Sequence, residues 1–216
     1  MYNKNYENKL WIILILSVTF LWVCLAGARK QIETEETIAG EIIRFHVLAN
    51  SDSEEDQNLK LAVRDKVVAS MQEKLKDVHE LAQARSILLE CQPELTESAR
   101  SVIRERGYDY NVTVDLEHTY FPEKTYGDMT FPAGKYEALR ICIGEAAGHN
   151  WWCVLFPSLC FVDETTAVVP EESKEKLENA LPEETYQSLF TDDTNTGIVF
   201  DTHIGEWWRS HFGPEE

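Results

Sequence analysis

Basic residues are scarce in this sequence of 216 residues: 20 Lys and Arg stand against 38 Asp and Glu, and the formal net charge is -18. A nucleic-acid surface needs clustered Lys and Arg to neutralise phosphates, so this charge argues against a nucleic-acid partner. It also disfavours attachment of the folded part to anionic lipids. A basic partner or a positively charged cleft is a more natural match.

The sequence also lacks the common signatures of catalytic and metal sites. It contains no glycine-rich phosphate loop, no GxSxG elbow and no HExxH motif. Its five cysteines show no CxxC-type spacing, which a structural zinc site would need. We therefore expect neither a metal nor another cofactor.

One long hydrophobic run is present near the N-terminus. Leu10 to Ala28 carries no charge and follows Lys4 and Lys9. As a helix with a rise of ~1.5 Å per residue, this run nearly crosses a hydrocarbon core of ~30 Å. The triplet at 26–28 also satisfies an A-x-A-like cleavage rule. Residues 1–28 are therefore predicted to be a signal peptide or a single transmembrane anchor, and the acid-rich residues 29–40 a polar spacer.

The rest of the chain alternates between strand and helix patterns, which predicts an α+β domain. Its sheet is expected to be mixed or antiparallel, with helices packed on one face. The expected strands begin near Ile42, Tyr108, Lys135 and Trp151; the expected helices span 54–76, 78–91 and 93–107. Residues 41–163 form this domain, and residues 164–216 are an acidic extension with a short helix at 171–180 and a Trp pair at Trp207 and Trp208.

Charged residues occupy informative positions in the first strand and helix. Arg44 and His46 share one strand face, opposite an apolar face, and are expected either to be solvated or hydrogen-bonded or to line a site. Ser53 and Asp56 resemble a capping box at a helix start. Asp56, Lys60 and Arg64 then form a stripe at spacings of four, which is expected to be exposed.

The run GHNWWCVLFPSLCF at 148–161 is the most unusual stretch of the chain. We predict that it is the central strand of a hairpin whose loop covers 144–150. Adjacent Trp151 and Trp152 point to opposite sides of an extended backbone, so one can anchor a core while the other faces a partner. Arg140, in the preceding strand, is expected to pair with a carboxylate such as Glu145 or to contact a partner.

Four cysteines lie outside the hydrophobic run, at 91, 142, 153 and 160, and export would permit disulfides among them. Cys142 would face Cys153 across a hairpin, whereas Cys153 and Cys160 could close a short loop. A different chemistry uses the same residues: an extracytoplasmic hydrolase with Cys153 as nucleophile, and His46 or His149 as base. A protein-recognition patch requires fewer special residues than a catalytic site, since it needs only exposed aromatics and a few oriented charges.

Three blocks together resemble the stage II sporulation protein R family of endospore-forming bacteria. They are IRFHVLANSDSEEDQNLKLAVRDKV at 43–67, YFPEKTYG at 120–127 and FPAGKYEALRICIGEAAGHNWWCVLFPSLCF at 131–161. The resemblance implies a signalling protein that is not an enzyme. It would be exported from the forespore into the space between the two septal membranes, secreted or held by an uncleaved leader. There it would activate a membrane-embedded aspartic-type protease of the opposing membrane, which processes an early mother-cell pro-sigma factor.

The resemblance also bears on particular residues. Cys153 and Cys160 both belong to its third block, which favours their mutual disulfide over the other pairings. We expect the partner-binding residues to come from the matched blocks. They are His46, Asn50, Asp52, Arg140, His149, Asn150, Trp151 and Trp152.

Overall fold

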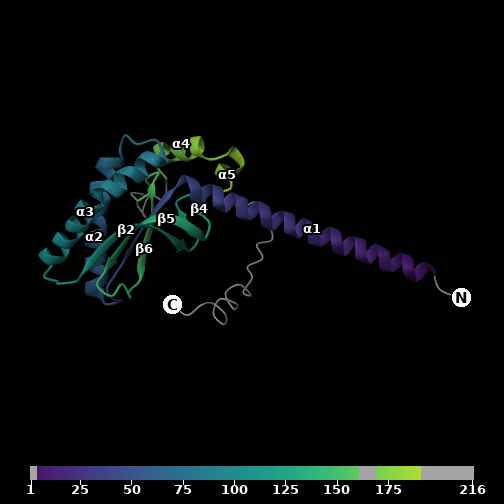
Figure 1. The fold of residues 1–216 in the computed structure, drawn as a ribbon, viewed down its shortest axis with the longest axis horizontal. Helices are drawn as coiled ribbons and strands as arrows, with labels where there is room; N and C mark the ends of the chain where they lie inside the picture. The colour runs from purple at the N-terminus through teal and green to yellow at the C-terminus, as the bar shows by residue number, and fades with distance from the viewer. Residues whose placement is uncertain (1–3, 161–168, 191–216) are drawn as a thin grey trace.

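The computed structural model describes residues 4–160 and 169–190 (Figure 1). The Trp pair predicted at Trp207 and Trp208 lies outside these residues. The combination of helices with a mixed sheet confirms the α+β class. The elements in chain order are α1 (Lys4–Glu41), β1 (Ile43–Leu48), α2 (Glu54–Leu75), α3 (Leu81–Glu105), β2 (Val112–Phe121), β3 (Lys124–Tyr126), β4 (Met129–Phe131), β5 (Gly134–Ile143), β6 (Asn150–Phe156), α4 (Glu171–Ala180) and α5 (Glu183–Gln187).

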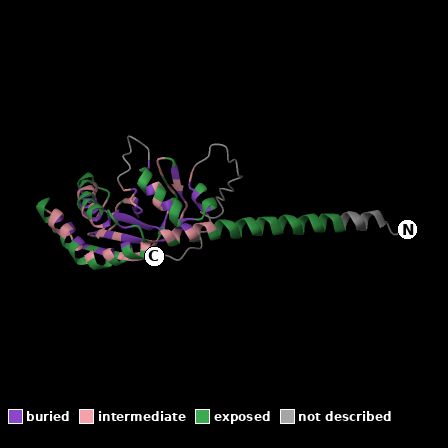
Figure 2. Cartoon of the chain, turned by 90° about the horizontal axis from the view of Figure 1, so that it is seen from above, coloured by how far each residue is buried: buried purple, intermediate pink, exposed green. Residues whose placement is uncertain are grey.

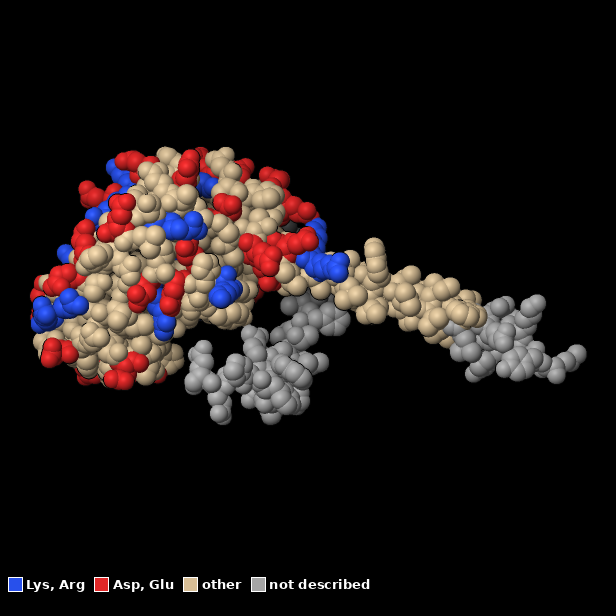
Figure 3. Space-filling model, viewed as in Figure 1, with Lys and Arg blue, Asp and Glu red and all other residues tan. Residues whose placement is uncertain are grey.

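Helix α1 projects from the folded part as a rod whose outer length is exposed (Figure 2). Among the described residues it is the one helix long and apolar enough to cross a membrane, a test that a signal sequence also passes. In Figure 3, the tan part of α1, between the blue side chains at the edge of the domain and the grey end, shows no charged side chain. Residues 29–40, expected as a polar spacer, continue the same helix, and Ile38 is only 1% exposed. The hydrophobic run is therefore joined to the domain by continuous helix.

Four strands form one mixed sheet in the order β2-β5-β1-β6. β1 runs parallel to β5 and antiparallel to β6, while β2 runs antiparallel to β5. β1 suits a central position because all of its residues except Leu48 are buried, on both faces of the sheet. β3 and β4 form a separate two-stranded ribbon.

The predicted hairpin is wrong, because β1 lies between β5 and β6. β6 is consequently an edge strand, and Cys142 is not beside Cys153. The connection after β5 crosses the end of β1, where the N–H groups of Ala147 and Gly148 donate to the carbonyls of Asn50 and Ala49 over 3.2 and 3.0 Å. A Cβ at Gly148 would collide with the Ser51 carbonyl, so this close crossing requires glycine there.

Helices α2 and α3 cover the first face of the sheet, as predicted. Ser53 caps α2, where its side chain accepts a hydrogen bond of 3.2 Å from the Asp56 N–H. The buried side chains between helices and sheet are apolar. They include Ile43, Phe45, Val47, Val112, Val114, Leu139, Ile141 and Ile143 of the sheet and Leu59, Val63, Val67, Met71, Leu88, Leu95, Ala99 and Ile103 of the helices.

The two helices predicted at 78–91 and 93–107 are a single helix, α3, with Pro93 inside it. Proline there costs one backbone hydrogen bond. Pro93 lies on the exposed side of the helix, where water can satisfy the freed carbonyl of Leu89. Leu88 and Leu95 continue one buried stripe past the proline, and this stripe keeps the helix continuous.

The strand predicted to start at Tyr108 instead begins at Val112. Gly107 ends α3 with a φ of 84°, and the Tyr108 N–H donates to the Ile103 carbonyl over 3.0 Å. Tyr108 therefore belongs to the terminating turn of the helix.

Among the described residues, the second face of the sheet is covered at one end. The end of α1, the ribbon, α4 and α5 meet the sheet there, so the described part of the C-terminal extension packs against the domain. The buried side chains of this second cluster include Ile38, Ile42, Phe121, Phe131, Tyr136, Val154, Val169, Leu177, Leu181 and Leu189.

Candidate functional site

No described helix or ribbon covers the other end of the second face, and polar side chains from all four strands reach it. We call this surface the open face. Strand alternation and the sheet register place these residues on one side, and all are half-buried or exposed except His46. The open face consists of His46 and Leu48 of β1, Asp115 and Glu117 of β2, Arg140 and Cys142 of β5, and Asn150 and Trp152 of β6.

His46 lies at the boundary between the open face and the covered end. Its ring stacks on Trp152 with centroids 5.0 Å apart and packs against Phe121 at 5.1 Å. Neither ring nitrogen has a hydrogen-bond partner among the described residues. Burial, together with the positive charges of Arg140 and Arg44, lowers the pKa of His46 from 6.5 to about 4. The imidazole is therefore neutral at physiological pH.

Arg140 pairs with Glu117, not with the predicted Glu145. The Nη1 atom of Arg140 donates to the Glu117 Oε1 over 2.8 Å, and both side chains are more than a third exposed. This hydrogen bond raises the pKa of Arg140, opposed by its partial burial. The guanidinium is thus oriented on the open face by a neighbouring strand and remains accessible from solvent.

Arg44 occupies a closed box of aromatic rings at the covered end, an arrangement that the strand pattern did not reveal. The side chain is fully buried, and its Cζ lies 4.4 Å from the Phe121 ring and 4.9 Å from the Tyr136 ring. Its one hydrogen bond among the described residues goes to the Tyr126 hydroxyl over 3.1 Å. Burial raises the pKa of Tyr136 to about 12, against the opposing effect of Arg44. Of the expected alternatives for Arg44, the side chain is hydrogen-bonded and not solvated.

A network of polar groups ties the end of the sheet to α2. Asp56, expected to be exposed, is 4% exposed and accepts hydrogen bonds from Asn50 Nδ2 over 2.8 Å and Ser51 Oγ over 2.5 Å. Burial raises the pKa of this carboxyl, but the hydrogen bonds outweigh burial and hold the pKa below its usual value. Asn50 also accepts from the N–H of Glu145 over 3.0 Å. Asn50 and Asp56 therefore hold the β5–β6 connection in place.

The same connection is held at a second point by Asp52 and Lys60. Asp52 accepts from both the backbone N–H and the ring Nδ1 of His149, over 2.6 and 2.5 Å, and the side-chain bond is the main cause of its lowered pKa. Lys60 donates to the His149 carbonyl over 2.9 Å, and burial lowers the pKa of Lys60. His149 itself is exposed, so a partner could reach its side chain, and its role in partner contact stays a prediction.

The two adjacent tryptophans point to opposite faces, as predicted. Trp152 lies on the open face beside His46, while Trp151 packs edge-on against Phe45 of the first face at 5.8 Å. The guanidinium of Arg64 lies 4.8 Å from the Trp151 ring. Both indoles are half-buried, so each serves a core and still presents surface.

Cys153 forms a disulfide with Cys160, with Cα atoms 5.4 Å apart, as the family resemblance favoured. Its sulfur is therefore not a free thiol. His46 and Cys153 also lie on opposite faces of the sheet, because Cys153 is paired with Phe45. Both observations argue against the hydrolase built on Cys153 with His46, and the disulfide alone argues against the version with His149.

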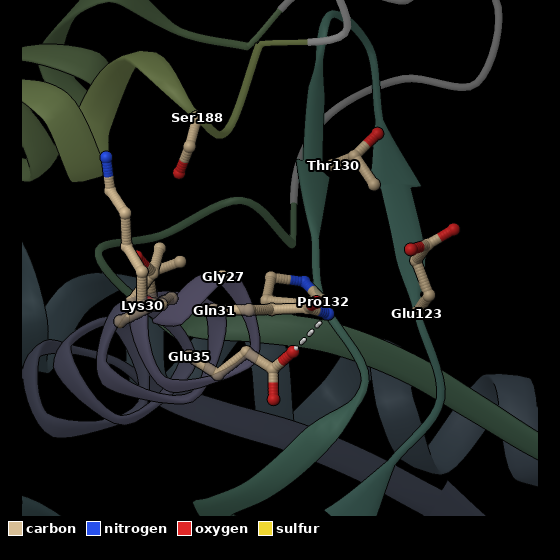
Figure 4. Close-up of a pocket in the computed structure, with 10 residues that line it drawn as sticks. Gly27, Lys30, Gln31, Glu35, Glu123, Thr130, Pro132 and Ser188 are labelled. Carbon is tan, nitrogen blue, oxygen red and sulfur yellow. Dashed lines mark hydrogen bonds between the residues drawn. The ribbon is translucent and has the colours of Figure 1, made fainter. Parts of the chain in front are cut away.

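A cavity of about 400 Å³ lies between α1, the ribbon and the end of α5 (Figure 4). Gln31 donates to Glu35 across one wall over 3.0 Å, while Glu123 and Ser188 line other walls. The lining holds no histidine or cysteine. In the described residues, no group of three or more His, Cys, Asp or Glu is arranged to hold a metal ion.

The predicted contact residues fall into two connected groups and one separate residue. His46, Arg140, Asn150 and Trp152 share the open face. Asn50, Asp52 and His149 meet at the crossing over β1, and Trp151 lies on the other face. The sequence reasoning did not predict that Arg44, Asp56 and Lys60 are buried. For Arg44 and Lys60 a signal was available, because each stands between two apolar residues, but Asp56 stands between Glu55 and Gln57 and offered none.

Comparison with known proteins agrees with the family resemblance of the three sequence blocks at 43–67, 120–127 and 131–161. The family model for stage II sporulation protein R matches residues 39–166. The stage II sporulation protein R of Bacillus subtilis (strain 168) is 36% identical over 172 residues, which cover 75% of this chain and 77% of that protein. No solved structure matches the chain. On the extent of the family match and the identity to this relative, the chain belongs to the stage II sporulation protein R family.

Proposed function

We propose that this protein is an exported signalling protein that activates a membrane-embedded aspartic-type protease by direct contact. The signal would pass from the forespore across the intermembrane space, and the protease would then process an early mother-cell pro-sigma factor. Membership in the family supports this proposal, since its name places the protein in sporulation. The hydrophobic start of α1 supports export, either as a cleaved signal or as a retained anchor.

The observation that carries the contact mechanism is the open face. This face keeps an oriented guanidinium, that of Arg140, accessible to solvent, together with the half-buried side chains of Asn150 and Trp152. Arg and Trp are the residues that most often dominate binding energy at protein interfaces. The strong net negative charge favours a basic region on the protease as the contacting surface.

The enzyme alternative receives no support from the site. The one cysteine it requires is oxidised to a disulfide, and the exposed His149–Asp52 pair is held by backbone contacts. A thiol count on the exported protein separates the two readings. Disulfide-bonded Cys153 and Cys160 would agree with signalling by contact, while a free Cys153 thiol would favour the hydrolase.

The test of the proposed function is the Trp152→Ala variant in the native bacterium. With export and abundance equal to wild type, pro-sigma-factor processing should fall, and co-purification of the membrane protease with the variant should weaken. Phe190→Ala, a change at the covered end of the same face, is the matched control and should leave processing intact. Unchanged processing in Trp152→Ala would remove the open face from the proposal.

A further inference from the structure

Strand β6 pairs with another described strand along only one of its two edges. β1 occupies the inner edge, and within residues 4–160 and 169–190 no strand pairs with the outer one. An edge strand carries a row of N–H and C=O groups that another extended chain can use. The outer edge of β6 is therefore a candidate for strand addition.

Two hydrogen bonds fix which backbone groups point outward. The Val154 carbonyl accepts from the Leu159 N–H over 3.0 Å, in the turn that follows β6, so it points away from β1. The Ala49 carbonyl accepts from the Gly148 N–H, so odd-numbered residues at this end of β1 point toward β6. Because alternate residues of an antiparallel strand face opposite edges, the backbone groups of Asn150 and Trp152 point outward.

The opposite edge of the sheet, β2, is protected where β6 is not. On β2, the Gln92 side chain of α3 donates to the Val114 carbonyl over 2.6 Å, and Asp115 and Glu117 place charges along the strand. Natural proteins protect edges against pairing with such charges and covering groups. The open half of β6, 150–152, contains neither a charged residue nor a proline.

The side chains beside this open half fit the recognition of an added strand. Trp151 projects to one face with Arg64 over its ring, and Trp152 projects to the other with His46 stacked on it. In strand addition, backbone hydrogen bonds supply affinity and flanking side chains supply specificity. Each indole can pack against the alternating side chains of an incoming strand.

We propose that the outer edge of β6 at Asn150–Trp152 receives an extended, basic segment of the partner protein as a fifth strand of the sheet. This rests on the proposed function for the identity of the partner and adds the mode of recognition. A charge of -18 on each copy opposes edge-to-edge pairing of two copies and favours a basic segment. The free edge is also short, because Leu159 and the disulfide-linked Cys160 close its far end at Val154.

The deciding variants are Asn150→Pro and its matched control Asn150→Ala. Both remove the amide side chain, but only proline removes the outward N–H, and neither touches the hydrogen bonds between β1 and β6. At equal abundance and melting temperature, Asn150→Ala should lose only what the amide side chain contributes on the open face, and it is the reference for Asn150→Pro. Asn150→Pro should form about tenfold fewer spores than this reference, because a lost interfacial hydrogen bond that leaves its partner unpaired is worth about that factor in affinity.

Residue-resolved amide exchange on the purified full chain in detergent micelles tests the edge without a variant. Asn150 and Trp152 amides should exchange quickly, and Trp151 and Cys153 amides slowly. Protection of the first pair in a chain of monomer mass would mean that the chain covers its own edge, and in a chain of dimer mass that a second copy does. Either result would overturn the proposal.

The outcomes also separate this inference from the proposed function. A folded Asn150→Pro variant with wild-type spore numbers, or an Asn150→Ala variant as defective as Asn150→Pro, would overturn strand addition and leave protease activation standing. Loss of spores in Asn150→Pro with normal pro-sigma-factor processing would overturn protease activation and leave strand addition standing.

Discussion

The two faces of the four-stranded sheet differ in the kind of side chain that they bury. The first face buries only apolar side chains under α2 and α3, with Phe45 and Leu139 fully buried. The second buries Arg44 and His46 without carboxylate partners among the described residues, which cover this face at one end. A buried charge without a counter-ion opposes folding. Burial of apolar side chains on the first face therefore offsets the cost of burying Arg44 on the second. We therefore propose that the first face mainly stabilises the fold and that the open part of the second face recognises the partner.

The largest expected effect is on the first face. Phe45→Ala should lower the free energy of unfolding by about 3–5 kcal/mol, because it leaves a cavity between α2 and the sheet. Denaturant unfolding measures the change. Leu89→Ala, at an exposed position of α3, is the control and should cost less than about 0.5 kcal/mol. Equal losses for the two variants would contradict the role of the first face as the main core.

The second face should make stability depend on pH through His46. Its pKa is 6.5 when unfolded and about 4 when folded, so between these values the unfolded chain binds a proton that the folded chain does not. Stability is therefore full above pH 6.5 and falls as the pH decreases toward 4, by about 3 kcal/mol. In His46→Phe this part of the slope should vanish. Parallel stability curves for wild type and variant would show that His46 is not buried neutral.

Replacing the buried cation of the second face should be tolerated. Arg44→Met keeps a long side chain in the aromatic box and removes an unpaired charge, so stability should stay equal or rise by about 1 kcal/mol. Thermal unfolding is the measurement, and Arg44→Ala, which leaves a cavity, should be less stable than Arg44→Met. A large loss in Arg44→Met would mean that the guanidinium has a partner that stabilises the fold.

The smallest effect on stability is expected on the open face. Arg140→Gln removes an ion pair with Glu117 whose two side chains are more than a third exposed, so it should cost less than about 1 kcal/mol. Pro-sigma-factor processing should nevertheless fall. Glu117→Gln, which frees Arg140 without removing it, should retain more processing. Normal pro-sigma-factor processing with both variants would show that Arg140 and Glu117 take no part in recognition.

Alternation and capping signals led to the right elements in several places. The strands near Ile42 and Lys135, the cap at Ser53 and the short helix Glu171–Ala180 occur as predicted. Local signals failed at Pro93 and at Tyr108. There, packing against the sheet and the terminating turn of α3 outweighed residue propensity. The candidate contact residues remain predictions, but their grouping on the open face and at the crossing was visible only in three dimensions.

By itself, the sequence determined the α+β class, the hydrophobic start, the apolar first face and the family, because periodicity and motif order are properties of neighbouring residues. Only the tertiary structure decided that β1 separates β5 from β6, that Arg44 and His46 are buried, and that β6 has a free edge. Strand order depends on contacts between residues about a hundred positions apart, and a pattern read along the chain carries no record of which distant strand lies alongside.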